Sequence, residues 1–182
     1  MKSTGIVRRI DDLGRIVIPK EIRKTLKIKE GDPLEILVEQ SQVLLKKYMP
    51  INSLEGCVVG VSKCLYNETN YSVAIFDSER VVAADGKAKD FLNDTITKEA
   101  LKIFNEGKSF AISESDNLNP IKLFSSDDFR FKSQLIVPVI NKNNETLAVI
   151  CLLDTDGKTK FGAVEIKLLK LVGEFIKSKI ID

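Results

Sequence analysis

The chain has 182 residues, of which 43% are apolar and 30% charged, with no histidine. This length suits one ordinary domain or two small ones, and the composition is typical of a globular protein rather than a disordered or fibrous one. Because histidine is the commonest general base and the commonest zinc ligand, its absence excludes Ser-His-Asp and Cys-His catalysis. We therefore expect a protein that is not an enzyme and that holds no cofactor and no metal.

The first ten residues contain no apolar stretch long enough for a signal peptide, and no run of about 18 apolar residues occurs anywhere. We therefore expect a cytoplasmic protein without a membrane partner. The three cysteines lack the CxxC spacing of a metal knuckle and lie in apolar stretches, so we predict that they are buried packing residues: Cys57, Cys64 and Cys151.

Formal charge is spread unevenly along the chain. Residues 1–29 hold nine basic side chains against three acidic ones, a net charge of +6, so that residues 30–182 carry −4 of the total of +2. Such asymmetry indicates that a polyanion binds at one end of the molecule.

The first 48 residues read as a small β domain. Pro19 suits the start of a short helix that presents Ile22 and Leu26 on one face and ends before Gly31. Around it, turn-forming sequence separates four strand-like runs: 6–10, 15–18, 34–39 and 43–48. A domain of this size with few large apolar side chains is near the limit of stability when it has no metal and no disulfide. We therefore expect it to associate with a second copy.

Arginines carry the candidate chemistry of this segment. Side chains alternate along a strand, so Arg8 and Arg9 face opposite sides and at least one lies near a turn, an edge or a subunit junction. Arg15 follows a turn directly, and Arg23 and Lys24 adjoin each other on the short helix. A guanidinium fork suits phosphate oxygens and the guanine edge. From charge alone, a DNA-binding surface and a merely solubilising cationic face fit equally well.

A domain boundary is expected near Pro50, which cannot donate to a continuing ladder and disfavours helix at Met49. The domains are then residues 1–52 and 53–182. Ser53 suits the cap of a helix reaching about Asn67, with an apolar stripe of Leu54, Val58, Val61 and Leu65. Two strands are expected next, at 71–77 and 80–85, followed by helical stretches around Phe91 and over 98–106. A strand at 109–113 and a polar loop to about 130 come after them. The domain then ends with a hairpin of 134–140 with 147–153 and a helix over 161–179. This order predicts an α+β domain with an antiparallel sheet and terminal helices.

Two features of the second domain could suggest ligands. The pair Asp127-Asp128 and the stretch 154–157 do not match the spaced oxygen ligands of a calcium loop, so we interpret them as solvated turns. Seven phenylalanines could line a small-molecule pocket, although core packing explains most of them: Phe76, Phe91, Phe104, Phe110, Phe124, Phe129 and Phe131.

The final helix carries two apolar stripes. One contains Phe161, Val164, Leu168, Leu171 and Phe175, and the other contains Ile166, Leu169, Ile176 and Ile180. A helix on a sheet needs one stripe, so the second predicts a bundle with the helix from Ser53 between two copies, and hence a homotetramer. Packing of the two helices within one chain is the alternative.

The run from Gly5 to Arg23, with its core DDLGRIVIPKEIR, and the following LKIKEGDPLEI resemble the AbrB-type transition-state regulators over nearly all of residues 1–48. The resemblance implies an all-β, swapped-hairpin dimeric barrel that binds double-stranded DNA. It implies a contact set of Arg8, Arg9, Arg15, Arg23 and Lys24. Lys24 stands where close relatives often have arginine, and it keeps the charge but loses the bidentate fork. The turn at 39–42 is one residue shorter than in relatives and lacks their glycine.

The size and element order of residues 51–182 are similar to the GAF-like domain of sporulation regulators in this family, which implies ligand sensing or assembly of dimers. We expect a nucleoid-associated activator or repressor of sporulation genes. One alternative is a small-molecule-binding signalling protein whose first domain only dimerises. Another is a swapped-hairpin antitoxin, although antitoxin tails are usually short and disordered whereas residues 53–182 are expected to fold.

Overall fold

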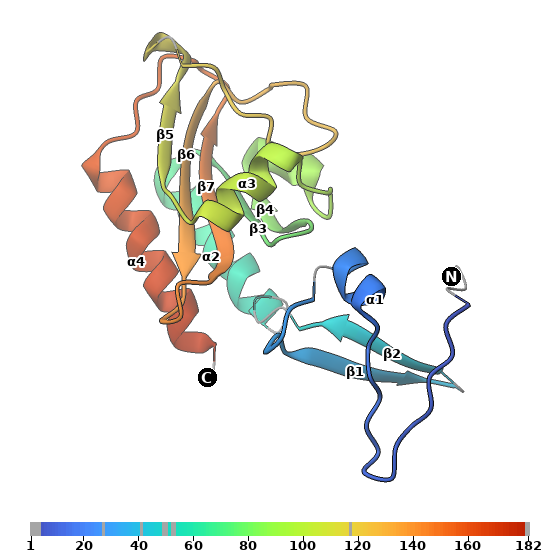
Figure 1. Cartoon of the computed structure of the whole chain (residues 1–182). Helices are drawn as coiled ribbons and strands as arrows, with labels where there is room; N and C mark the ends of the chain where they lie inside the picture. The colour runs from blue at the N-terminus through green and yellow to red at the C-terminus, as the bar shows by residue number, and fades with distance from the viewer. Residues whose placement is uncertain are drawn as a thin grey trace. The chain divides into compact units, whose positions relative to one another are not determined.

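The structure is a computed structural model that describes residues 5–26, 28–40, 42–48, 51, 54–116 and 118–180. The chain divides into two compact units, Met1–Tyr48 and Met49–Asp182, here called unit 1 and unit 2. The sequence places the boundary a few residues later, and the expected cap at Ser53 lies outside the described residues. Figure 1 shows the elements of each unit.

Unit 1 contains a short helix and an antiparallel hairpin. The helix begins after Pro19, because the fixed φ of proline suits a helix start and its missing N–H costs no intrahelical bond there. The hairpin pairs Leu34 with Lys47 at one end and Glu39 with Gln42 at the other. These elements, as predicted, are α1 (Lys20–Thr25), β1 (Leu34–Glu39) and β2 (Gln42–Lys47).

The first two segments of unit 1 that were predicted as strands are not strands in the structure. Residues 6–10 and 15–18 form no strand in this single chain, and instead run as two arms joined by the turn at 11–14 (Figure 1). Asp11 N donates to Arg15 O at 3.1 Å where the arms meet the turn. A strand needs a neighbour for its backbone groups, and β1 and β2 pair only with each other among the described residues.

Unit 2 is built on a five-stranded antiparallel sheet with the order β4-β3-β7-β6-β5. Both faces of the sheet are covered, so β3 is wholly buried and β7 is buried except at its two ends. The strands agree with the predicted ones: β3 (Ser72–Phe76), β4 (Val81–Asp85), β5 (Phe110–Ser113), β6 (Ser133–Ile140) and β7 (Thr146–Asp154).

Helices cover the two faces of this sheet (Figure 1). On one face pack the terminal helices α2 (Glu55–Thr69) and α4 (Ala163–Lys179), whose side chains share a core with β3, β6 and β7. On the other pack the 3₁₀ helix η2 (Gly86–Phe91) and α3 (Lys98–Glu106). The predicted α+β architecture with an antiparallel sheet and terminal helices is confirmed. None of the helices within the described ranges has the length and apolar run that a membrane span requires.

The two stripes of α4 have different surroundings. Leu169 and Ile176 are fully buried, whereas Val164, Leu171 and Phe175 are 76%, 67% and 45% exposed. Phe161 was expected on the same stripe as the exposed Val164, Leu171 and Phe175, but it is buried with its ring 5.0 Å from that of Tyr71, because it precedes the helix and turns into the core.

The prediction that all three cysteines are buried is confirmed only for Cys151. Cys151 lies in the central strand and is buried, and Cys57 is half-buried. Cys64 is exposed, because α2 turns Val58 and Leu65 toward the sheet and leaves position 64 on its outer side.

Candidate nucleic-acid interface

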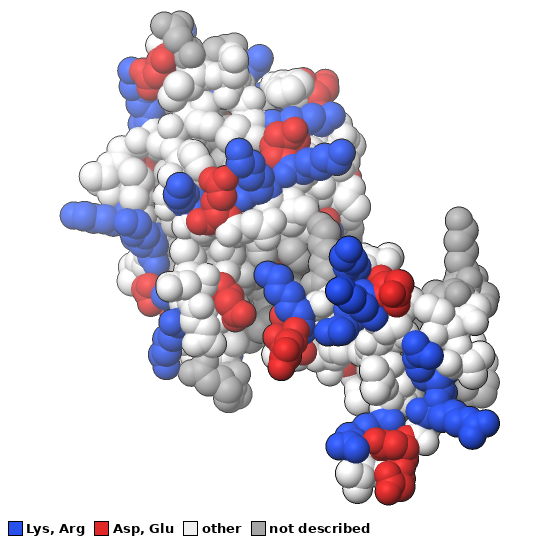
Figure 2. Space-filling view, viewed as in Figure 1, with Lys and Arg blue, Asp and Glu red and all other residues white. Residues whose placement is uncertain are grey.

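All five basic residues of the expected contact set are exposed on unit 1. Arg8 and Arg9 lie on the first arm, Arg15 begins the second arm, and Arg23 and Lys24 occupy the last turn of α1. Figure 2 shows basic side chains over α1 and along the arms, with acidic ones at the turn. Among the described residues, Arg15 is the one member of this set with a salt bridge, so the other four charges are available to a partner.

The turn between the arms fixes Arg15. Asp11 Oδ1 accepts hydrogen bonds from the backbone N of Leu13 at 3.1 Å and of Arg15 at 2.7 Å. Its Oδ2 accepts from Arg15 Nε at 2.7 Å. Gly14 has φ +76°, a conformation that favours glycine, and its N donates to Asp11 O at 3.0 Å.

These bonds favour the ionised form of Asp11. Backbone and side-chain hydrogen bonds from Arg15, followed by the backbone N–H of Leu13, lower the pKa of the Asp11 carboxyl below its ordinary value. Asp11 is not among the residues predicted from the sequence to have a function. The signal was present, because Asp four residues before Arg with Gly between them is typical of a turn closed by the Asp side chain.

The acidic residues of unit 2 follow the solvated-turn interpretation only in part. Asp156 is exposed, and its Oδ1 accepts from Lys158 N at 2.9 Å within the loop after β7. Asp127, by contrast, is 1% exposed, so that interpretation is wrong for it. Its Oδ1 accepts from Arg130 N at 3.1 Å, which turns the loop back over the aromatic core.

Five phenylalanines of unit 2 pack together on the sheet face opposite α2 and α4. Phe91 stacks on Phe124 with ring centroids 5.0 Å apart and meets Phe131 edge-on at 5.9 Å. The Arg130 guanidinium lies 5.0 Å above the Phe91 ring. The core-packing interpretation is confirmed for the five buried rings, Phe76, Phe91, Phe104, Phe124 and Phe131, whereas Phe110 is half-buried and Phe129 is exposed.

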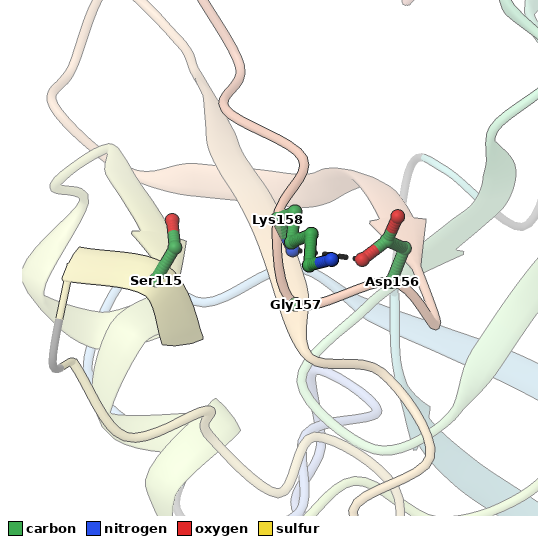
Figure 3. Close-up of a pocket in the computed structure, with 4 residues that line it drawn as sticks. All are labelled: Ser115, Asp156, Gly157 and Lys158. Carbon is green, nitrogen blue, oxygen red and sulfur yellow. Dashed lines mark hydrogen bonds between the residues drawn. The ribbon is translucent and has the colours of Figure 1, made fainter.

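A shallow open hollow on unit 2 is lined by Ser115, Asp156, Gly157 and Lys158 (Figure 3). Its polar groups already bind one another: Gly157 O accepts from Ser115 N at 2.9 Å and from Ser113 Oγ at 2.8 Å. These bonds tie the loop after β7 to the end of β5. The hollow is therefore a structural junction and offers no converging groups to a ligand.

Comparison with known proteins supplies matches for both units. Residues 55–180 match the family "Stage V sporulation protein T C-terminal, transcription factor", and residues 7–53 match "Antidote-toxin recognition MazE, bacterial antitoxin". The chain is 38% identical over 178 residues to stage V sporulation protein T of Bacillus subtilis (strain 168), with 97% of each chain covered. It is 62% identical over 50 residues to the transition state regulatory protein AbrB of that organism, which covers 28% of this chain and 52% of that protein.

Unit 2 also has neighbours among solved structures. The GAF domain of an Acinetobacter phosphoenolpyruvate-protein phosphotransferase superposes with a TM-score of 0.56 at 12% identity, covering 70% of this chain and 81% of that one. This likeness shows the GAF fold alone.

The two units and these matches define a transcription factor with an AbrB-like N-terminal part and a GAF-like C-terminal domain. The antitoxin-type match is confined to residues 7–53, whereas the likeness to the sporulation regulator runs along nearly the whole chain. The chain belongs to the stage V sporulation protein T family, and the resemblance to AbrB-type regulators inferred from the sequence is confirmed.

Proposed function

We propose that this chain regulates sporulation genes by binding duplex DNA, at the nucleoid in the cytoplasm, through the basic face of unit 1. The basic face consists of Arg8, Arg9, Arg15, Arg23 and Lys24. The observation that carries the proposal is that all five side chains are exposed on the arms and on α1. Arginine and lysine held on a folded unit neutralise phosphates, and the arginine forks can also reach base edges.

The DNA-binding form is a homodimer through unit 1. Among the side chains of unit 1 that the structure describes, none is buried. Val7, Val17 and Val38 are each at least 75% exposed, and they lie on both arms and on β1. A second copy would cover these side chains and supply strand neighbours to both arms, which favours the swapped-hairpin barrel.

A salt titration of the full chain on duplex DNA tests the basic face. Replacing one phosphate-binding arginine by alanine should reduce the slope of log K against log salt by about 1 per contact, or about 2 in a symmetric dimer. Lys170→Ala, at an exposed position on α4, is the control and should leave the slope unchanged. If all four arginine variants bind like the parent, the contact set is wrong, and the signalling protein that only dimerises through unit 1 gains support.

Unit 2 has a second role in assembly. The exposed stripe of α4, Val164, Leu171 and Phe175, supports contact with another copy of unit 2, which joins dimers into a homotetramer. An unidentified small-molecule ligand of unit 2 would act by changing the spacing of the paired DNA-binding units. It could do so only if it binds one arrangement more tightly than the other.

A further inference from the structure

The strongest unexplained feature of unit 1 is a carboxylate in the turn that joins the two arms of its basic face. Three hydrogen bonds join Asp11 to the backbone and side chain that follow it, two of them to Arg15. The adjacent Asp12 is also exposed, and the structure gives it no such bond. A carboxylate beside DNA phosphates repels them, so Asp11 is unfavourable for binding unless it does something else.

The hydrogen bond from Nε to Asp11 constrains the Arg15 guanidinium but leaves its two Nη groups available as donors. With Nε held at 2.7 Å from Asp11 Oδ2, rotation about the end of the side chain is restricted. The two Nη atoms donate to no described residue, and the side chain remains 69% exposed. The paired donors of these atoms match a phosphate or the O6 and N7 of guanine.

Stability does not account for the side-chain bond between Asp11 and Arg15. An exposed ion pair contributes little to folding, because water screens the charges and ordering two side chains costs entropy. Ordering Arg15 before DNA arrives removes that entropic cost from the binding step, which is worth a few-fold in affinity per side chain.

We propose that Asp11 is a positioning residue that aims the Arg15 guanidinium and thereby raises the preference for specific over non-specific DNA. This inference rests on the proposed function, in which Arg15 touches DNA. Asp11 contacts no nucleotide in this account and acts only through Arg15.

Variants of the full chain separate positioning from charge. Asp11→Asn keeps an oxygen for the backbone bonds but replaces the ionised acceptor of Nε. Asp12→Asn removes the same charge from the neighbouring residue and is the matched control. The probes are the tightest duplex selected from random sequence by the parent chain, and poly(dI-dC) as non-specific duplex.

Asp11→Asn should lower the ratio of specific to non-specific affinity about tenfold, because two copies of Arg15 each lose about threefold in a dimer. Asp12→Asn should tighten both affinities slightly and leave the ratio unchanged. In an Arg15→Ala background, Asp11→Asn should have no further effect on the ratio, because the two residues act together.

Two results would overturn the proposal. Asp11→Asn could behave like Asp12→Asn, in which case Asp11 contributes only charge. It could instead lower both affinities equally together with the thermal unfolding temperature, in which case Asp11 only stabilises the turn. Failure of the proposed function is recognised separately: Arg15→Ala alone would then bind both duplexes as the parent does, and the inference would fall with it.

Discussion

At the scale of single residues, Lys24 is the member of the basic face that lacks a guanidinium. It follows Arg23 in the last turn of α1, where a cation also interacts favourably with the helix dipole. Lysine binds a phosphate as a point charge, whereas arginine can form two parallel hydrogen bonds to a phosphate or a guanine. We therefore expect Lys24 to add affinity but little discrimination among sequences.

Lys24→Arg tests this interpretation. We expect about a tenfold gain on a selected duplex, since one bidentate base contact discriminates by about 1–3 kcal/mol, and an unchanged salt slope because the charge is the same. Fluorescence anisotropy at several salt concentrations measures both quantities. An equal gain on specific and non-specific duplex would mean that position 24 contacts only phosphate.

Gly86 of unit 2 has a backbone conformation and a close neighbour that disfavour any larger residue. Its φ is +65°, and a Cβ there would lie 2.7 Å from Tyr66 Cε2 on α2. Gly86→Ala should lower the free energy of unfolding by about 1–3 kcal/mol through strain and crowding. Gly60→Ala is the control, because Gly60 is exposed within α2 with nothing within 4 Å, and alanine there should stabilise the helix by up to about 1 kcal/mol. Urea unfolding measures the free energy of unfolding of both variants. Equal values for Gly86→Ala and Gly60→Ala would contradict this interpretation of Gly86.

At the scale of elements, α4 has one buried apolar face and one exposed apolar face. Leu169→Ala should lower the free energy of unfolding by about 2–5 kcal/mol, because it leaves a cavity at a fully buried site between α4 and the sheet. Leu171→Ala should change the free energy of unfolding of a dissociated chain by less than about 0.5 kcal/mol, since the side chain is 67% exposed. Denaturant unfolding at low protein concentration compares the two variants. Equal losses would show that Leu171 is also part of the core.

The elements of unit 2 could be predicted from the sequence because their apolar spacing reflects burial within one chain. The helices α2, α3 and α4 and all five strands occur where that spacing indicates. The arms could not be predicted in the same way. Residues 6–10 and 15–18 have strand-like composition, but composition does not say which chain supplies the neighbouring strand.

Most of the candidate site residues could also be predicted from the sequence. The exposed arginines and Lys24 follow from charge and resemblance, and the turn before Arg15 follows from its glycine. The bond between Asp11 and the Arg15 side chain depends on side-chain geometry that no pattern specifies. Burial of Asp127 was likewise missed, because two adjacent aspartates are typical of a solvated turn. In the structure Asp127 accepts from Arg130 N, and the Arg130 guanidinium lies over Phe91.

At the scale of the whole molecule, exposed apolar surfaces on both units predict a tetramer. Unit 1 would join chains through its arms, and unit 2 through the exposed stripe of α4. A Leu171→Glu, Phe175→Glu double variant should reduce the tetramer to a dimer without unfolding unit 2, because both side chains are exposed. Light scattering on the parent and the variant checks this, and a parent no larger than a dimer would contradict it. Leu169 is unsuitable for this test because it is fully buried.

Two charge-matched variants test whether the basic face recognises DNA. One replaces Arg8, Arg9, Arg15 and Arg23 by alanine, and the other replaces four exposed lysines of unit 2, Lys98, Lys108, Lys158 and Lys170. Both lose the same formal charge. At 100 mM salt the first should bind duplex DNA on the order of a hundredfold or more weaker than the parent, and the second should bind within about threefold of it. Equal weakening of the two variants would contradict recognition by the basic face, because binding would then depend on net charge rather than on these arginines.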